Sequence, residues 1–325
     1  MVDFNYADGG FRVSLMDTLA VILQEPERLT LGRLALTNAS KADVVVAIDY
    51  SGISTGTERL LWSGRMPHFP GMGYPLVPGY ESVGRVIEAG AKSGRAVGER
   101  VFVPGARCFG DVRGLFGGAA ARLVTPGAKV LPYDESLGER GVLFALAATA
   151  YHALAHGPLP DLIVGHGVLG RLLARLAVVL GGAPTVWETN AARHDGAVGY
   201  CVVDPAQDER RDYKTICDVS GDSAILDRLV ARLAPGGEIV LAGFYSDALS
   251  FNFAPAFMRE ARIRVAAQWR QADLVAVRDL AQSGRLSLDG LITHRSDARD
   301  ADGAYRLAFG DASCQKMILD WRACT

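Results

Sequence analysis

Residues 162–170 read L-I-V-G-H-G-V-L-G, a short apolar run that leads into glycines at positions 165, 167 and 170. This G-x-G-x-x-G spacing is typical of a turn that binds the pyrophosphate of a dinucleotide, because the glycines permit a tight turn and close packing. Leucines at 169, 172, 173, 176 and 180 follow at the spacing of one helix face, and Gly181 and Gly182 end the pattern. The stretch therefore predicts a strand, a turn and a helix whose N-terminus receives phosphates.

A second short strand is predicted at 185–187, and it ends in Glu188, about 20 residues beyond the glycines. A carboxylate at this place accepts hydrogen bonds from ribose hydroxyls and repels a 2′-phosphate, which favours NAD over NADP. Arg193 lies near enough in sequence to meet a 2′-phosphate, so NADP stays an alternative cofactor. A glycine-rich turn in another kind of α/β protein is the alternative interpretation of the motif. The residues expected to bind the cofactor are Gly165, Gly167, Val168, Leu169, Gly170, Glu188, Ser220, Gly243, Phe244 and Tyr245.

The composition is that of a globular protein of two domains. The chain has 325 residues, 49% of them hydrophobic, and a net charge of −2, so no basic field indicates nucleic acid. The longest strongly apolar stretch, 142–150, is far shorter than the ~20 residues that cross a bilayer, and residues 1–15 carry no basic stretch typical of a secretory signal. We therefore expect a cytoplasmic protein without a transmembrane segment. Five scattered cysteines without a C-x-x-C suggest neither a disulfide framework nor a zinc knuckle.

The chain changes character near Ala145. Before it, strands are expected at 18–23, 29–36, 44–48, 83–89 and 100–103, punctuated by glycine and proline. After it, strands at 162–164, 185–187, 201–203, 215–219, 238–242 and 263–267 alternate with helices, which implies a parallel sheet covered on both faces. The run 316–320 is expected to close the sheet of the first domain. The predicted fold is α/β: a β-rich domain plus a doubly wound parallel sheet.

Three further segments carry a family resemblance: P-G-Y-E-S-V-G-R-V at 78–86, G-E-R-V at 98–101 and A-P-G-G at 234–237. Together with the glycine turn they resemble the medium-chain dehydrogenase/reductase family over nearly the whole chain from Met16. The resemblance implies a GroES-like catalytic domain over 16–148 and 272–325 and a Rossmann NAD-binding domain over 149–271. Residues 1–15 are then an N-terminal extension.

The resemblance breaks at the metal ligands of the family. Zinc-dependent members hold the catalytic metal with a cysteine, a histidine and a further cysteine or acid. In this chain Ser54 stands at the position of the cysteine and Tyr80 at that of the histidine, and the third ligand position falls near Ala145. The structural zinc loop is also missing, with only Cys108 in that region. Because zinc prefers thiolate, imidazole or carboxylate donors, we expect a zinc-free enzyme with no metal site.

Within the family, residues 50–81 resemble the enzymes that oxidise the 3-hydroxyethyl group of a chlorophyllide or bacteriochlorophyllide to a 3-acetyl group in bacteriochlorophyll biosynthesis. This implies a tetrapyrrole substrate and NAD as hydride acceptor. A conjugated ring delocalises positive charge as hydride leaves, so the protein has to position the carbon and accept a proton. The candidates for this catalysis are Ser54, Thr57, Glu58, Tyr80, Glu81 and His152, although Ser54 and Thr57 also suit a turn, and Glu81 and His152 also suit structural roles.

Residues 60–74 combine aromatic residues, methionines and glycines without a helical or strand period, which predicts a long functional loop. Its surface suits a flat apolar ring, with an arginine for a propionate and His68 for the central magnesium; an ordinary packed loop is the alternative. The substrate residues expected are Arg59, Trp62, Arg65, His68, Phe69, Tyr74, Tyr151 and Trp269. A zinc-free NADPH-dependent quinone or enoyl reductase and a non-catalytic nucleotide-binding protein stay open as functions. A homodimer and a place at the periphery of photosynthetic membranes stay open as associations.

Overall fold

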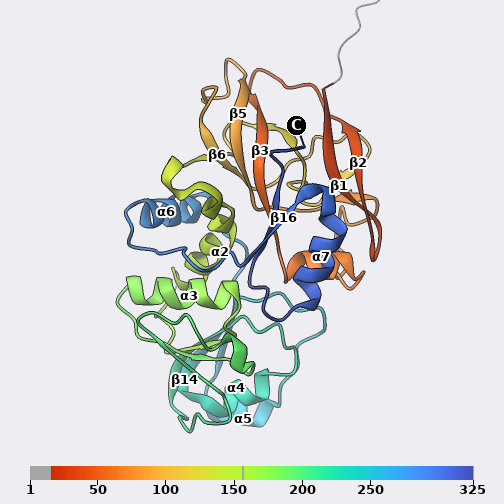
Figure 1. Ribbon diagram of the computed structural model, residues 1–325. Coiled ribbons are helices and arrows are strands. Elements are labelled where there is room, and N and C mark those ends of the chain that lie inside the picture. The colour runs from red at the N-terminus through yellow and green to blue at the C-terminus, as the bar shows by residue number, and fades with distance from the viewer. Residues whose placement is uncertain (1–15, 156, 325) are drawn as a thin grey trace, which may run out of the picture.

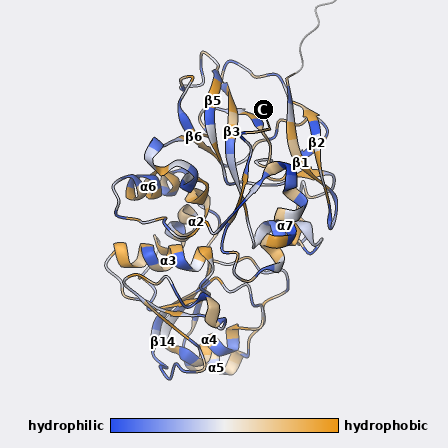
Figure 2. Ribbon diagram, in the orientation of Figure 1, coloured by the Kyte–Doolittle hydropathy of each residue, from blue (hydrophilic) through white to orange (hydrophobic). Residues whose placement is uncertain are grey.

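The computed structural model describes residues 16–155 and 157–324, so the predicted extension at residues 1–15 lies outside the described residues. The described chain forms a β-rich part and a part built on a parallel sheet, with helices between them (Figure 1). The hydropathy colouring shows hydrophobic segments alternating with hydrophilic ones along the strands and helices (Figure 2). This is the distribution expected of elements that bury one face.

The β-rich part contains a seven-stranded and a four-stranded sheet. The larger sheet has the order β16-β17-β3-β5-β6-β9, with β8 paired to β3. Its strands are β3 (Asp43–Ile53), β5 (Ser82–Ala89), β6 (Arg100–Val103), β8 (Arg122–Pro126), β9 (Leu131–Pro132), β16 (His294–Asp297) and β17 (Met317–Asp320). The smaller sheet has the order β2-β1-β4-β7, from β1 (Asp17–Glu25), β2 (Arg28–Ala35), β4 (Leu76–Val77) and β7 (Arg113–Gly114).

The prediction that the run 316–320 closes the first domain's sheet is confirmed. β17 pairs antiparallel with β3, so that Met317 lies opposite Ile53 and Asp320 opposite Tyr50. Ile318 and Leu319 are fully buried. A segment far along the sequence therefore completes the sheet that contains residues 50–53, directly before Ser54.

The second part is a six-stranded parallel sheet of order β12-β11-β10-β13-β14-β15. Its strands are β10 (Leu162–Val164), β11 (Thr185–Trp187), β12 (Cys201–Val203), β13 (Tyr213–Asp218), β14 (Leu233–Leu241) and β15 (Arg262–Val265). The strand order reverses direction beside β10, and the carboxyl ends of β10 and β13 meet there. In open parallel sheets this switch point is where ligands bind. The helices of this sheet are α3 (Val168–Val179), α4 (Leu226–Arg232) and α5 (Phe253–Met258).

Two helices, α2 (Phe144–Leu154) and α6 (Gln271–Gln282), pack on each other, and α2 also packs on α3 (Figure 1). One predicted domain boundary, between residues 148 and 149, falls inside α2, which runs through it without a break. The domain boundaries stay a prediction. The remaining helices are α1 (Thr57–Trp62) and α7 (Ala301–Gly310), with 3₁₀ turns η1 (Glu135–Leu143), η2 (Ala191–Arg193) and η3 (Ala298–Asp300).

Two local predictions are wrong. Residues 60–62 were expected to start a loop but end the helix α1, which has only six residues and so shows no recognisable period. Leu180 was expected on the buried face of α3, but the helix ends at Val179 and Leu180 is 41% exposed. A residue beyond the last turn no longer follows the helical face, whereas Leu172 and Leu176, within the helix, are fully buried.

Candidate active site

A cleft of about 1130 Å³ lies between the carboxyl ends of the parallel strands and the β-rich part. Drug-sized ligands occupy pockets of about 300–1,000 Å³, so this cleft is large enough for a dinucleotide beside part of a second molecule. The predicted site residues on its wall are Ser54, Thr57, Arg59, Tyr80, Gly165, Gly167, Val168, Leu169, Gly170, Glu188, Ser220, Gly243, Phe244 and Trp269. The structure therefore brings together residues from both halves of the sequence.

The glycine turn joins β10 to α3 at the cleft wall. Gly165 has a φ of 103°, a left-handed conformation that favours glycine. A Cβ on Gly170 would lie 1.8 Å from the Gly165 carbonyl oxygen, so α3 crosses the turn too closely for a side chain there. Gly167 is the N-cap of α3 and offers no side-chain cap. The first N–H groups of a helix have no partner within it, and the first residues of α3, Val168, Leu169 and Gly170, line the cleft, which suits a phosphate.

Glu188 follows β11 and is buried, yet it lines the cleft. Its Oε2 accepts the backbone N–H of His166 at 3.0 Å, and its Oε1 accepts that of Asn190 at 2.8 Å. These bonds hold the carboxylate between the glycine turn and the segment after β11. Each oxygen keeps a further lone pair with which it can accept a hydroxyl.

His166, the spacer within the glycine motif, organises the neighbouring segment. Its Nδ1 lies 2.6 Å from the Arg193 carbonyl oxygen, which can only accept, so Nδ1 carries the proton. Its Nε2 lies 2.9 Å from the Tyr200 hydroxyl and accepts from it in the neutral ring. Burial lowers the pKa of His166 to about 4, which keeps it neutral. Arg193 in turn donates to the Ala312 carbonyl oxygen at 3.0 Å, and both residues line the cleft.

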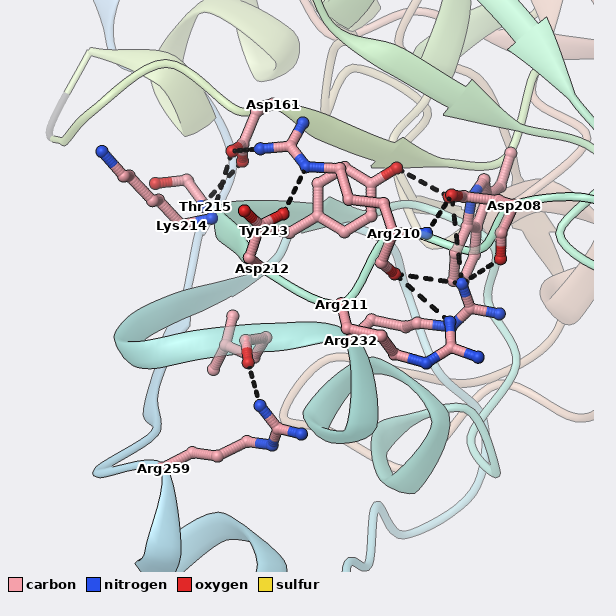
Figure 3. A network of polar contacts seen from close by, with 12 residues as sticks. Asp161, Asp208, Arg210, Arg211, Asp212, Tyr213, Lys214, Thr215, Arg232 and Arg259 are labelled. Atoms are coloured by element: carbon pink, nitrogen blue, oxygen red, sulfur yellow. Dashed lines mark hydrogen bonds and ion pairs between the residues drawn. The ribbon is translucent and has the colours of Figure 1, made fainter.

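Trp187 is a further residue of the cleft wall that the sequence did not single out. Its indole N–H donates to Asp208 at 2.6 Å, and Asp208 also accepts the Tyr213 hydroxyl at 2.6 Å. Figure 3 shows Asp208 among the arginines of this network, and Arg232 lies over the Trp187 ring at 5.2 Å. The segment between β12 and β13 thereby fixes the indole beside the glycine turn, where the Gly165 N–H donates to the Trp187 carbonyl oxygen at 2.9 Å.

On the other side of the switch point, Ser220, Gly243 and Phe244 line the cleft. Tyr245, predicted with them, is not on the wall. Its hydroxyl donates to the buried Asp218 carboxylate at 2.5 Å, and burial raises the pKa of Asp218. Tyr245 therefore ties the turn after β14 to the end of β13.

The β-rich side of the cleft presents a pair of hydroxyl groups. The Tyr80 hydroxyl donates to Ser54 Oγ at 2.7 Å, and both residues line the cleft together with Thr57. Burial is the largest cause that raises the pKa of Tyr80 above its ordinary value, so the phenol is neutral. Hydroxyl groups both donate and accept, so the pair is suited to hold a substrate hydroxyl.

The other predicted catalytic residues lie behind this wall. Glu58 and Glu81 are buried and do not line the cleft. Burial raises the pKa of Glu58 to about 7 and also raises that of Glu81, which pairs with Lys316 at 2.6 Å. His152, on α2, is buried 2.9 Å from the Asp273 carboxylate of α6. Of the predicted catalytic residues, only Ser54, Thr57 and Tyr80 therefore line the cleft and can contact a ligand there.

The donors present do not suit a catalytic zinc. Within residues 16–155 and 157–324, no cluster of three or more His, Cys, Asp or Glu side chains has the geometry to hold a metal ion. Ser54 and Tyr80 bond to each other, and Ala145 is buried in α2 without a ligand atom. Hydroxyl groups at neutral pH are poor zinc ligands.

The predicted substrate residues divide into two groups. Arg59 and Trp269 line the cleft. The others lie off its wall: Trp62 packs on Phe309, the Tyr74 hydroxyl donates to the Leu61 carbonyl, Phe69 packs on the β-rich core, Tyr151 is half-buried on α2, and His68 is exposed. Arg65 reaches the other part of the molecule, where it donates to Ser246 at 3.3 Å. Residues 63–75 therefore pack on the β-rich part and contact the turn after β14.

Residues 40–135 match the model of the alcohol dehydrogenase GroES-like domain. The chain is 58% identical over 311 residues to the 2-desacetyl-2-hydroxyethyl bacteriochlorophyllide A dehydrogenase of Rhodobacter capsulatus, covering 94% of this chain and 99% of the relative. The enzyme of the same name from Cereibacter sphaeroides is 57% identical over 316 residues, covering 95% and 99%.

Solved structures support the same architecture. An alcohol dehydrogenase of Escherichia coli in complex with NADH superposes with a TM-score of 0.80 at 21% identity, covering 94% of this chain and 99% of that one. A dehydrogenase of Sinorhizobium meliloti bound to NADP gives 0.78 at 19% identity, with the same coverage. Proteins of this fold thus bind either nucleotide. No helix in the described part of the chain combines the length and the apolar character needed to span a bilayer. The chain is a dehydrogenase that belongs to the medium-chain dehydrogenase/reductase family, with a GroES-like catalytic domain and a Rossmann-type sheet.

Proposed function

We propose that this protein oxidises the hydroxyethyl group of a bacteriochlorophyllide to an acetyl group, with NAD as hydride acceptor and without catalytic zinc. The substrate is that named for two relatives of 57% and 58% identity over nearly the whole chain. The observation that carries the reaction is the hydroxyl pair Ser54 and Tyr80, which lines the same cleft as the glycine turn.

The cofactor part of the proposal rests on the glycine turn and Glu188. NAD, when bound, accepts a hydride from the carbinol carbon. The helix start at Gly167 receives the pyrophosphate, and the buried Glu188 carboxylate accepts ribose hydroxyls and disfavours a 2′-phosphate. Arg193 also lines the cleft, so the preference for NAD depends on how its guanidinium is held, here by the Ala312 carbonyl.

The proton of the substrate hydroxyl is taken up at Ser54 and Tyr80. The substrate carbon loses hydride while its oxygen loses a proton, and a C=O double bond forms. Attachment to the conjugated macrocycle stabilises the positive charge that develops on this carbon. The residues then need only orient the hydroxyl and take its proton. A hydroxyl does so by accepting one proton while releasing its own, and the released proton passes to solvent water. Trp269 and Arg59, which line the same cleft, are the contacts for the macrocycle and a carboxylate side chain.

Purified protein with NAD and hydroxyethyl bacteriochlorophyllide tests the proposal, followed by absorbance of the acetyl product. The expected result is formation of acetyl product with an equal amount of NADH. Reduction of a quinone or an enoyl substrate by NADPH, without activity on the tetrapyrrole, would instead support the reductase alternative. Nucleotide binding with no turnover of either substrate would indicate a non-catalytic protein.

Two measurements test the finer parts. Calorimetric titration is expected to show tighter binding of NAD than of NADP, and Glu188→Ala is expected to narrow the difference between the two affinities; equal affinities in the unmodified protein would contradict the role of Glu188.

Elemental analysis of the active protein is expected to find no stoichiometric zinc. About one zinc per chain, lost together with activity on chelation, would refute the zinc-free reaction.

A further inference from the structure

The peptide unit between Ile53 and Ser54 is held from both of its polar ends. The Ile53 carbonyl oxygen accepts from the Lys316 ammonium at 3.1 Å, and the Ser54 N–H donates to Glu58 Oε1 at 3.2 Å. Because a peptide unit is planar, these two bonds fix its orientation. They thereby restrict the direction in which Ser54 presents its hydroxyl group.

Lys316 and Glu58, which bind the two ends of this peptide unit, each have a buried partner of their own. The Tyr305 hydroxyl donates to Glu58 Oε2 at 2.6 Å, and Lys316 donates to Glu81 Oε2 at 2.6 Å. The four side chains come from α1, α7, the segment before β5 and the segment before β17, and none is more than 1% exposed. Segments far apart in the sequence therefore meet behind one residue of the cleft wall.

Stability alone is a weak reason for this arrangement. Desolvation of two carboxylates and an ammonium is costly, and apolar replacements of buried ion pairs are often neutral or stabilising. Within the described residues Glu81 Oε1 is buried without a hydrogen-bond partner, which adds to that cost. What a buried polar network does provide is one defined geometry. Here the geometry concerns the backbone that carries Ser54.

We propose that Tyr305, Glu58, Lys316 and Glu81 are positioning residues that orient Ser54 for its hydrogen bond with Tyr80 and for the substrate hydroxyl. This inference rests on the proposed function, because Ser54 and Tyr80 are the proposed proton acceptors. None of the four residues lines the cleft, so each acts through the Ser54 backbone.

The arrangement implies a dependence on pH. Burial is the main cause that raises the pKa of Glu58 to about 7; the Glu81 charge raises it further, and the Tyr305 hydroxyl, the Ser54 N–H and Lys316 lower it. Ionised Glu58 accepts at both oxygens, whereas protonated Glu58 places a proton where one of these donors now points. The hydrogen bonds that orient the Ser54 backbone are therefore all formed above a pH of about 7, and the bond to Glu58 weakens below it.

Tyr305→Phe tests this mechanism without removing a charge. It deletes a hydrogen bond that favours ionised Glu58, so the rising limb of kcat against pH is expected to move upward by about one pH unit. Glu58→Gln is expected to remove the limb. Tyr133→Phe is the matched control, because it also deletes the hydrogen bond of a buried tyrosine, here to the Gly138 carbonyl oxygen at 2.8 Å and away from the cleft wall; its limb is expected to coincide with that of the unmodified enzyme.

An infrared titration separates this inference from the proposed function. Whatever the substrate is, the infrared spectrum is expected to show the carbonyl band of a carboxyl group that titrates near neutral pH. This band is expected to be absent in Glu58→Gln, and the pH of its titration midpoint is expected to be higher in Tyr305→Phe. If that titration behaves as expected but hydroxyethyl bacteriochlorophyllide is not oxidised, the proposed function fails and the buried assembly stands. An unmoved kcat limb and an unmoved infrared titration in Tyr305→Phe would overturn the positioning role, even if Glu58→Gln does not fold.

Discussion

Alanine at Gly170 is expected to destabilise the protein, whereas alanine at Gly167 is expected to weaken cofactor binding alone. Cβ atoms essentially never approach another atom closer than 3.0 Å, yet a Cβ on Gly170 would lie 1.8 Å from the Gly165 carbonyl oxygen. The start of α3 must therefore move away from the turn by at least 1.2 Å, the difference between these distances. Overpacking of this kind costs about 1–3 kcal/mol of the free energy of unfolding.

Gly167 is the matched control, because a Cβ there meets nothing within 4 Å and its φ of −71° is open to alanine. Its methyl group would instead enter the space over which the pyrophosphate approaches the helix start. Urea unfolding followed by tryptophan fluorescence is expected to show a lower midpoint for Gly170→Ala and an unchanged one for Gly167→Ala. Calorimetry is expected to show loss of NAD affinity in both. An unchanged midpoint in Gly170→Ala would refute the close crossing of α3 over the turn.

Three other predictions concern the β-rich side of the cleft. The pKa of Glu58, raised from 4.5 to about 7 by burial, means that its contribution to stability is present below pH 4.5 and is lost as pH rises through 7. Compared with Glu58→Gln, the unmodified protein should therefore lose about 3 kcal/mol of unfolding free energy between pH 4.5 and 8. If urea unfolding gives the same difference in free energy between the two proteins at both pH values, this reasoning is contradicted. Ser54→Ala and Tyr80→Phe should each lower kcat by about 10²-fold or more with unchanged NAD affinity, and rates close to that of the unmodified enzyme would remove the hydroxyl pair from the reaction. A short glycine link in place of residues 63–73 should raise the KM for the tetrapyrrole and leave NAD binding near normal; a lower Tm with an unchanged KM would make this segment a packing element.

The sequence alone predicts those parts of the molecule whose determinants are contiguous. The strands expected at 162–164, 185–187 and 201–203 coincide with β10, β11 and β12, because each is a short apolar run between turn residues. The glycine turn belongs to the same class, since its three glycines lie within six residues. The helix α1 escaped because six residues show less than two turns of any pattern.

The support behind Ser54 could not be predicted in this way. Lys316 lies 235 residues from Glu81 in sequence, and Tyr305 lies 247 residues from Glu58. A buried lysine and a buried tyrosine carry no local signal, because nothing near them in sequence shows which carboxylate they meet. His166 was passed over for a different reason: inside a glycine motif it occupies a spacer position, and its role depends on Tyr200 and Arg193, which only the fold brings to it.

The pairing of β17 with β3 determines the order in which this enzyme can mature during synthesis. Lys316 leaves the ribosome 263 residues after Ile53, a delay on the order of 10–50 s at the usual rate of translation. The strands of the parallel sheet, β10 to β15, are all synthesised within that interval. Meanwhile β8 can pair with residues 43–47 of β3, but residues 50–53 lack their partner on that side and offer a short open edge to other chains. The nucleotide half can thus fold early, whereas the Ser54 backbone acquires its Lys316 contact only after residue 316 has emerged. Nascent chains that stop before this point would retain the parallel sheet without a finished catalytic wall.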